Sequence, residues 1–269
     1  MRQGRIRNKI AGVILALCVC VMAVTGYKWW EGEQAYREGN ENYDQLTALV
    51  RPGGPPVFVQ GSNFDKPDVP IPHMDIDFDA LQAVNQDAVA WLYCPDTVID
   101  YPVMRATEYD YYLRHLPDGT YNINGTLFID YHNAADFSDS LTIIYGHHMD
   151  SGRMFGSLVG YKEQDYYAAH PYMYLYTRQG NYRIDLMYGC VIGAGEWRER
   201  SFMFKENLGN LMAFAAGNTT FASDLRYTEG DRIIAMSTCS YEFDDARYVV
   251  VGLLRPEYGS DSGTTSEAV

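Results

Sequence analysis

The feature that most constrains this chain is an apolar run near its start, from Ile10 to about Tyr27, with no charged residue inside it. Eighteen residues at about 1.5 Å each make a helix of roughly 27 Å, just long enough to cross the hydrocarbon of a bilayer. Four basic residues precede the run, so residues 1–9 are expected to stay in the cytoplasm. Trp29 and Trp30 then resemble the aromatic belt of a membrane interface. We therefore predict a single-pass anchor over residues 10–27 and an extracellular body.

Two other interpretations of the apolar run remain open: a cleaved secretory signal and a buried helix of a soluble protein. The run is longer than the apolar core of most signals. Ala23-Val24-Thr25 is also a poor cleavage site, and bulky residues follow it. The anchor and the cleaved signal both place the body of the chain outside the cytoplasm.

The length, charge and cysteine content of the chain limit what kind of domain its exported part can form. The chain has 269 residues, enough for one domain of about 200 residues and a smaller attachment. Its net charge is −14, and without residues 1–27 it becomes −18, from 17 basic and 35 acidic residues. This charge argues against nucleic acid as a ligand, because phosphate binding needs a basic surface. Five cysteines are too few for a disulfide scaffold. Cys18 and Cys20 lie in the apolar run, and of Cys94, Cys190 and Cys239 at least one must be free.

The segment after the anchor is predicted to connect it to the main domain. We expect a helix over 31–51, with Tyr36, Tyr43, Leu46 and Val50 near one face, and then a proline- and glycine-rich linker over 52–74. Residues 28–74 thus form a helix and an extracellular linker, and residues 257–269 a loose tail.

Residues 75–256 are predicted to form one mainly β domain. A short helix over 77–84 begins it, with Asp77 as N-cap and Phe78, Leu81 and Val84 facing inward. One further helix is expected over 205–216, with Leu208, Leu211, Met212 and Ala215 on a stripe. The other regular elements are eight short β-like runs, at 89–93, 98–103, 125–129, 141–145, 172–177, 182–191, 232–237 and 248–254. Eight strands in one unit favour a closed or nearly closed barrel.

Cys239 is the first candidate for chemistry, because it follows an apolar strand that ends in small polar residues. A thiol that attacks an amide needs a proton-transfer partner and a fixed cation for the oxyanion. A hairpin would bring Arg247 back beside Cys239, although this arginine could instead pair with Asp244 or Asp245. Of six histidines, only His147 and His148 directly follow an apolar strand.

Other kinds of site find little support. Neighbouring histidines on a strand point to opposite faces, so one ion is not expected to bind both. The sequence has no metal-binding motif such as HExxH or CxxC, and no nucleotide-binding glycine loop. We expect neither a metal nor a cofactor.

Three blocks of the sequence, taken in order, form a specific pattern. The first is Tyr145-Gly146-His147-His148-Met149, which continues through Ser151 to Leu158. The second is Ser237-Thr238-Cys239 followed by Arg247-Tyr248-Val249-Val250. The third runs from Ile99 through Asp110-Tyr111-Tyr112-Leu113 to Asp130. Together, the three blocks resemble the class B sortases.

The resemblance implies a fold and a reaction. The fold is a sortase-type closed β-barrel of about eight strands, with N-terminal helices and one helix before the cysteine strand. The reaction is a transpeptidation in Gram-positive bacteria. Cys239 would cleave a C-terminal sorting motif of surface proteins after threonine, through a thioester. His147, which directly follows the glycine, would transfer protons, and Arg247 would hold the substrate and the oxyanion. A peptidoglycan-precursor amine would resolve the thioester.

The resemblance also bears on substrate binding. Ser237, Thr238, Tyr145 and Leu113 match positions of the substrate groove, whereas Tyr109 and Ser240 depart from the residues usual there. The sorting motif therefore stays open. Two alternatives also stay open: a pilin-polymerising sortase, which would use a pilin lysine as the amine, and a surface binding module without catalysis. Cys94 and Cys190 match nothing catalytic and are expected to be packing residues.

Overall fold

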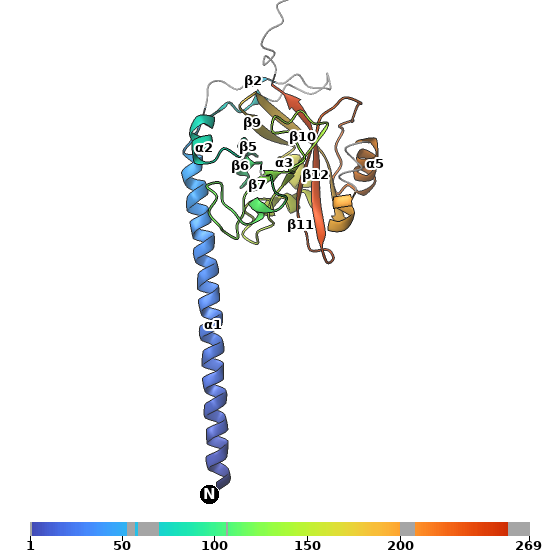
Figure 1. Cartoon of the computed structure of the whole chain (residues 1–269). Coiled ribbons are helices and arrows are strands. Elements are labelled where there is room, and N and C mark those ends of the chain that lie inside the picture. The colour runs from blue at the N-terminus through green and yellow to red at the C-terminus, as the bar shows by residue number, and fades with distance from the viewer. Residues whose placement is uncertain (1, 53–56, 59–69, 106, 200–207, 258–269) are drawn as a thin grey trace, which may run out of the picture. The chain divides into compact units, whose positions relative to one another are not determined.

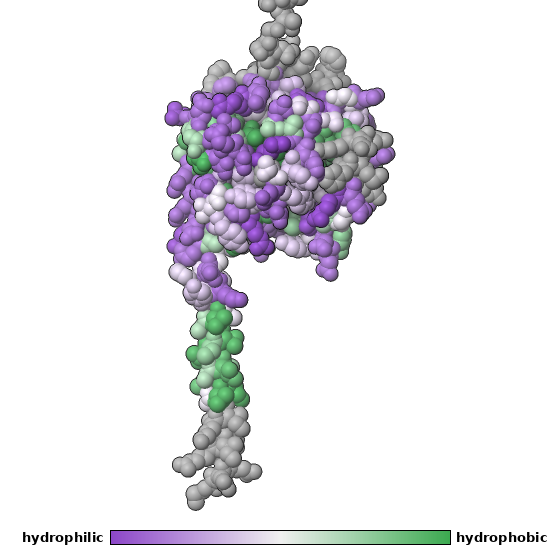
Figure 2. Space-filling model, in the orientation of Figure 1, coloured by the Kyte–Doolittle hydropathy of each residue, from purple (hydrophilic) through white to green (hydrophobic). Residues whose placement is uncertain are grey.

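The computed structural model describes residues 2–52, 57–58, 70–105, 107–199 and 208–257, and the chain divides into two compact units, 1–41 and 42–269. The first unit consists of most of helix α1 (Arg2–Thr47). Over Gly12–Thr47 this helix is long and apolar enough to cross a membrane, with a best window of mean hydropathy 1.8 and no burial in the protein. Figure 2 shows the apolar part as a hydrophobic band that gives way to hydrophilic residues.

The helix differs from the one predicted over 31–51. It is continuous with the apolar run and ends at Thr47, four residues early, because Val50–Pro52 form strand β1 and pair with β4 (Met74–Ile76). The residue before a proline favours extended backbone, which suits a strand at this point. Tyr43 and Leu46 are buried as expected, but Tyr36 is 40% exposed, so the predicted face is only partly correct.

The segment expected to be an irregular linker contains short strands. Besides β1 and β4, β2 (Val57–Phe58) pairs with β3 (Pro70–Ile71). Residues 53–56 and 59–69 lie outside the described residues, as do 258–269 of the predicted tail. Two-residue and three-residue strands have no period to detect, so only their pairing makes them visible.

The second unit is built on a closed barrel of eight strands in the order β10-β12-β11-β8-β7-β6-β5-β9 (Figure 1). The strands are β5 (Ala88–Tyr93), β6 (Asp100–Met104), β7 (Leu127–Ile129), β8 (Leu141–Tyr145), β9 (Tyr172–Thr177), β10 (Asn181–Gly193), β11 (Ile233–Cys239) and β12 (Ala246–Pro256). All eight predicted runs are strands, and the predicted closed barrel is confirmed. Closure leaves no free sheet edge.

The pairing of three strands decides where side chains meet. β8 and β11 are parallel, with Ser237 opposite Tyr145, and β11 and β12 are antiparallel, with Cys239 opposite Arg247. The last residues of β8 and β11 and the first residues of β12 therefore lie at the same end of the barrel. Segments nearly 100 residues apart in the sequence become neighbours there.

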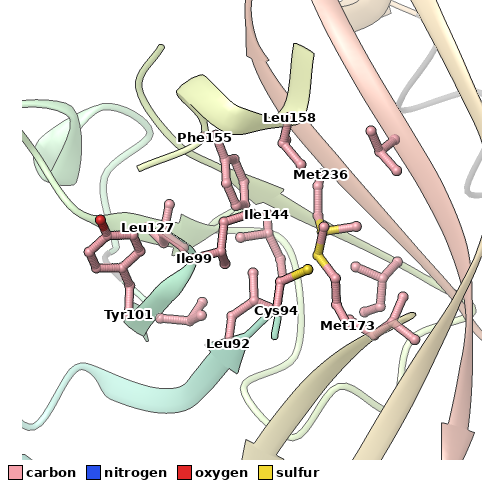
Figure 3. Close-up of a cluster of buried hydrophobic side chains, with 14 of the residues drawn as sticks. Leu92, Cys94, Ile99, Tyr101, Leu127, Ile144, Phe155, Leu158, Met173 and Met236 are labelled. Atoms are coloured by element: carbon pink, nitrogen blue, oxygen red, sulfur yellow. The ribbon is translucent and has the colours of Figure 1, made fainter. Parts of the chain in front are cut away.

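The core explains why the central strands are apolar without interruption. In β11, Ile234 and Met236 point into the barrel, whereas Ile233 and Ala235 pack in a second cluster on its outer face. Figure 3 shows the inner cluster, in which Met236 meets side chains from several other strands. A strand buried on both faces reads as a continuous apolar run, as β11 and β12 do.

Helices lie on the outside of the barrel and in the connections between its strands. The outer cluster is covered by α5 (Leu208–Asn218), whose buried residues are the predicted stripe of Leu208, Leu211, Met212 and Ala215. Residues 205–207 of the predicted helix lie outside the described residues. The remaining short helices are η1 (Tyr111–Leu113), η2 (Gly156–Lys162) and α3 (Gln164–Ala169), and residues 194–199 are also helical.

Helix α2 (Phe78–Val84) confirms most of the prediction for 77–84. The side chain of Asp77 accepts a hydrogen bond from the Ala80 amide at 2.9 Å, as an N-cap does, and Leu81 is buried. Val84, however, is 45% exposed and does not face inward. Val84 is the last residue of this seven-residue helix. In so short a helix, the segments packed around it, rather than the helical period, decide which side chains are covered.

Candidate active site

A cavity of about 180 Å³ opens where β8, β11 and β12 meet. Its walls include all seven residues that the sequence singled out, namely Leu113, Tyr145, His147, Ser237, Thr238, Cys239 and Arg247. A larger cavity of about 480 Å³ lies between β1, β4 and the β9–β10 turn, but it contains none of these residues. We take the smaller cavity as the candidate site because it alone brings a thiol, an imidazole and a guanidinium together.

Cys239 and Arg247 are neighbours across two paired strands. Cys239 is the last residue of β11 and pairs with Arg247 in β12. The side chain of Cys239 is half-buried. The Arg247 guanidinium donates to the main-chain carbonyl of Ala246 at 3.0 Å, and among the described residues it forms no ion pair. The alternative pairing with the Asp244 or Asp245 carboxylate is therefore not seen. The guanidinium keeps donors for a further carbonyl oxygen.

Only one of the two adjacent histidines reaches the cavity. His147 lines it, and the Nε2 atom of its ring lies 2.5 Å from the carbonyl oxygen of Leu113. His148 instead packs edge-on against the exposed ring of Tyr241, 5.0 Å away between centroids. The opposite orientation of the two side chains is the one expected for neighbours in extended backbone.

Tyr145 is fixed by a hydrogen bond on the wall of the cavity. Its hydroxyl donates to the Asp130 carboxylate at 3.2 Å, and Asp130 also contacts His132 Nδ1 at 2.9 Å. Burial, followed by the nearby Asp130 charge, raises the pKa of Tyr145 well above its usual value. The hydroxyl therefore stays protonated at all physiological pH values.

Two buried polar atoms at the cavity have no hydrogen-bond partner among the described residues. They are the hydroxyl of Thr238, on a residue only 2% exposed, and the indole Nε1 of Trp197, on a residue 4% exposed. Leaving such groups unsatisfied is costly, so they are suited to bond a ligand that enters the cavity.

Six wall residues were not predicted as site residues: Tyr109, Phe128, Gly146, Ala194, Trp197 and Arg198. The sequence marks Tyr109 only as a departure from the family pattern. Its ring packs edge-on to Tyr145 at 6.0 Å, and the Arg198 guanidinium lies 5.2 Å from it. Trp197 and Arg198 come from the helical segment after β10, and no local pattern marks that segment as part of the site.

The loop between β11 and β12 is tied to η2 beside Cys239. The Lys162 ammonium donates to the Ser240 hydroxyl at 3.2 Å and forms an ion pair with Glu242, which also accepts from Ser240. Partial burial would raise the pKa of Glu242, but the hydrogen bonds from Lys162 and Ser240 outweigh it and lower that pKa. The residue directly after Cys239 is Ser240, which is not acidic. The Glu242 carboxylate nevertheless lies next to it, because Ser240 donates a hydrogen bond to Glu242.

The remaining thiols are separate from the site. Cys94 is buried in the inner core cluster and Cys190 in the outer one, and burial raises the pKa of Cys190 to about 12. Cys18 and Cys20 are exposed on α1, and all five cysteines are free. The prediction that Cys94 and Cys190 are packing residues fits their place in the core clusters.

Comparison with known proteins identifies the family. Sortase B of Listeria monocytogenes is 33% identical over 178 residues, which cover 65% of this chain and 72% of that protein. The X-ray structure of Clostridium perfringens sortase B matches with a TM-score of 0.62 and 26% identity, covering 66% of this chain and 99% of that one. A Streptococcus pyogenes class B sortase involved in pilus biogenesis matches with a TM-score of 0.59 and 26% identity, over 66% and 97%. A scan against protein-family models finds no match. The chain belongs to the class B sortases and is a cysteine transpeptidase.

Proposed function

We propose that Cys239 is the nucleophile of this transpeptidase, that His147 transfers the protons and that Arg247 binds the developing oxyanion. The proposal rests on the cavity that these three residues share, and on the direct pairing of Cys239 with Arg247. Arginine suits its part because it stays charged and presents several donors in a fixed plane.

The substrate is a surface protein with a C-terminal sorting motif. The thiolate of Cys239 attacks the threonine carbonyl, a C–S bond forms, and the C–N bond breaks as His147 gives a proton to the leaving amine. An incoming amine then attacks the thioester and loses a proton to His147; a new C–N bond forms, and the C–S bond breaks to release the Cys239 thiolate. The thioester conserves the energy of the cleaved amide, so the exchange needs no nucleotide.

The walls of the cavity hold the substrate in this proposal. Tyr145, Leu113 and Ser237 form its sides, and the unpartnered Thr238 hydroxyl and Trp197 N–H bond the peptide. Tyr109 stands where relatives often have asparagine, which gives this groove an aromatic wall and points to a sorting motif adapted to it. The acceptor is an amine of a peptidoglycan precursor.

The nucleophile is tested by incubation of the full chain with a sorting-signal peptide and mass spectrometry of the acyl-enzyme. Cys239→Ala should form none, whereas Cys190→Ala, which removes a thiol from the outer core cluster, should still form it. An acyl-enzyme in Cys239→Ala would refute the assignment.

The base is tested by a matched pair of neighbours. His147→Ala should lose at least about 100-fold in kcat, in the range of general acid–base catalysis, whereas His148→Ala should lose much less. Equal losses would contradict the choice of His147.

A pilin lysine is the second candidate for the acceptor amine, and the Streptococcus pyogenes relative involved in pilus biogenesis favours it. The two acceptors give different linkages. Mass spectrometry of the product joined to a cell-wall precursor amine or to a lysine side chain decides between them.

The helix over residues 10–27 would hold the barrel at the outer face of the membrane, next to exported substrates and membrane-bound amine carriers. Such tethering raises the effective concentration of both partners. Protease added to intact cells should then digest the barrel, and a protected barrel would contradict this topology.

A further inference from the structure

The His147 ring is held from one side by the main chain. Its Nε2 atom lies 2.5 Å from the Leu113 carbonyl oxygen. A carbonyl oxygen only accepts hydrogen bonds, so Nε2 must carry a proton in this geometry. The other ring nitrogen, Nδ1, has no hydrogen bond to any of the residues that the structure describes, and no carboxylate among them contacts the ring.

A glycine makes this contact possible. Gly125 has a φ of +59°, and a Cβ built there would lie 2.7 Å from the Leu113 carbonyl oxygen and 2.9 Å from His147 Cδ2. It would also lie 2.7 Å from the Tyr112 carbonyl oxygen. No real Cβ approaches backbone atoms this closely, so any side chain at residue 125 would push the carbonyl and the imidazole apart.

We propose that the Leu113 carbonyl, in the space left by Gly125, is the positioning group of His147: it keeps the proton on Nε2 and leaves Nδ1 as the atom that exchanges protons with substrate. This inference rests on the proposed role of His147. It adds that His147 adopts one tautomer, and that the Leu113 carbonyl oxygen, packed against Gly125, selects this tautomer.

The assignment fits both half-reactions. In the first, the imidazolium gives its Nδ1 proton to the leaving amine while Nε2–H stays bonded to Leu113. In the second, the neutral Nδ1 accepts a proton from the incoming amine, and Nε2 is again unchanged. A carboxylate fixes the histidine in serine proteases. A carbonyl does so here without placing a second charge at the site.

The test compares two glycines with left-handed backbone in the same loop region. Gly125→Ala adds a methyl group between Leu113 and His147. Gly119→Ala adds one at a φ of +84°, where the nearest atom is the Tyr111 hydroxyl at 3.6 Å, an ordinary contact. Both substitutions strain the backbone, but only Gly125→Ala also crowds the Leu113 and Tyr112 carbonyls and the His147 ring.

Each full-length variant, in detergent, is assayed for transpeptidation. We expect Gly125→Ala to lose about 100-fold in kcat, the effect of a misplaced catalytic group, with KM for the peptide nearly unchanged. Gly119→Ala should stay close to wild type. Equal kcat values for the two variants, with both folded, would overturn the proposal.

A second measurement reads the tautomer directly. In spectra of protein labelled with ¹⁵N-histidine, wild type and Gly119→Ala should show a ring N–H signal on Nε2 that exchanges slowly with water and is absent in His147→Gln. Gly125→Ala should lose it. If Gly125→Ala does not fold, the wild-type spectrum alone decides, because a proton on Nδ1 or a rapidly exchanging ring N–H contradicts the proposal.

The outcomes separate this inference from the proposed function. If His147→Ala keeps its activity, the proposed role of His147 fails. If His147→Ala is inactive but Gly125→Ala behaves like Gly119→Ala, only the positioning by Leu113 fails.

Discussion

Gly146, directly before His147, is a position where one methyl group should disturb both stability and activity. Its own N–H donates to the Ser237 carbonyl at 3.2 Å, which ties the end of β8 to β11. A Cβ built on Gly146 would overlap a Leu127 methyl carbon and lie 2.7 Å from the Phe155 ring. Leu127 and Phe155 are both fully buried, so neither can swing into solvent to make room.

The magnitude follows from the cost of overpacking. Forcing one extra carbon into a packed core costs about 1–3 kcal/mol. At roughly 2–4 °C per kcal/mol for a domain of this size, Gly146→Ala should lower the melting temperature by about 2–12 °C. Activity should fall further than stability explains, because the backbone shift moves the next residue, His147.

The assay is thermal unfolding of the full chain in detergent. Near-ultraviolet circular dichroism of the barrel monitors the unfolding. Gly217→Ala is the matched control. Gly217 lies exposed in α5, with no atom within 4 Å of the place that an added methyl group would take, and alanine there should raise stability by up to about 1 kcal/mol. A melting temperature of Gly146→Ala equal to that of wild type would refute the packing argument.

Three further outcomes are expected. Burial would raise the pKa of Asp231, but the hydrogen bonds from Thr228 and Arg255 outweigh it and lower that pKa. Asp231→Asn should therefore cost stability at pH 7. In acid-unfolding curves, the difference in stability between the variant and wild type should vanish as pH falls below about 4. Asp185→Ala leaves Arg183 buried without its carboxylate and should destabilise the barrel by about 3 kcal/mol in urea, whereas a loss under about 1 kcal/mol would contradict this. A membrane-impermeant thiol reagent should label Cys239 and spare the two buried barrel thiols, and labelling of all three in the folded protein would count against their burial.

Much of the fold could be predicted because its signals are local. The strands near Cys239 and His147 are continuous apolar runs bounded by turn residues, and the stripe on α5 repeats with helical period. The Asp77 cap is also a local signal, since the carboxylate bonds an amide three residues away. These patterns depend on neighbours in the sequence, so no knowledge of the rest of the molecule is needed to read them.

The errors lie where distant segments decide. Helix α1 ends at Thr47 because Val50 pairs with Ile76, and Val84 is exposed because no other described element covers it. The sequence also could not show that Glu242, two residues beyond Ser240, supplies a carboxylate through Lys162.

By itself, the sequence determined the apolar helix, the eight barrel strands and the identity of the three groups proposed for chemistry, since each is written in residue type and short-range period. Tertiary structure alone decided that β8 lies parallel to β11, that Trp197 and Arg198 complete the cavity and that Leu113 holds the His147 ring. The physical reason is that barrel closure sets strand ends side by side through hydrogen bonds between segments far apart in the chain, and such pairings leave no periodic trace in either segment.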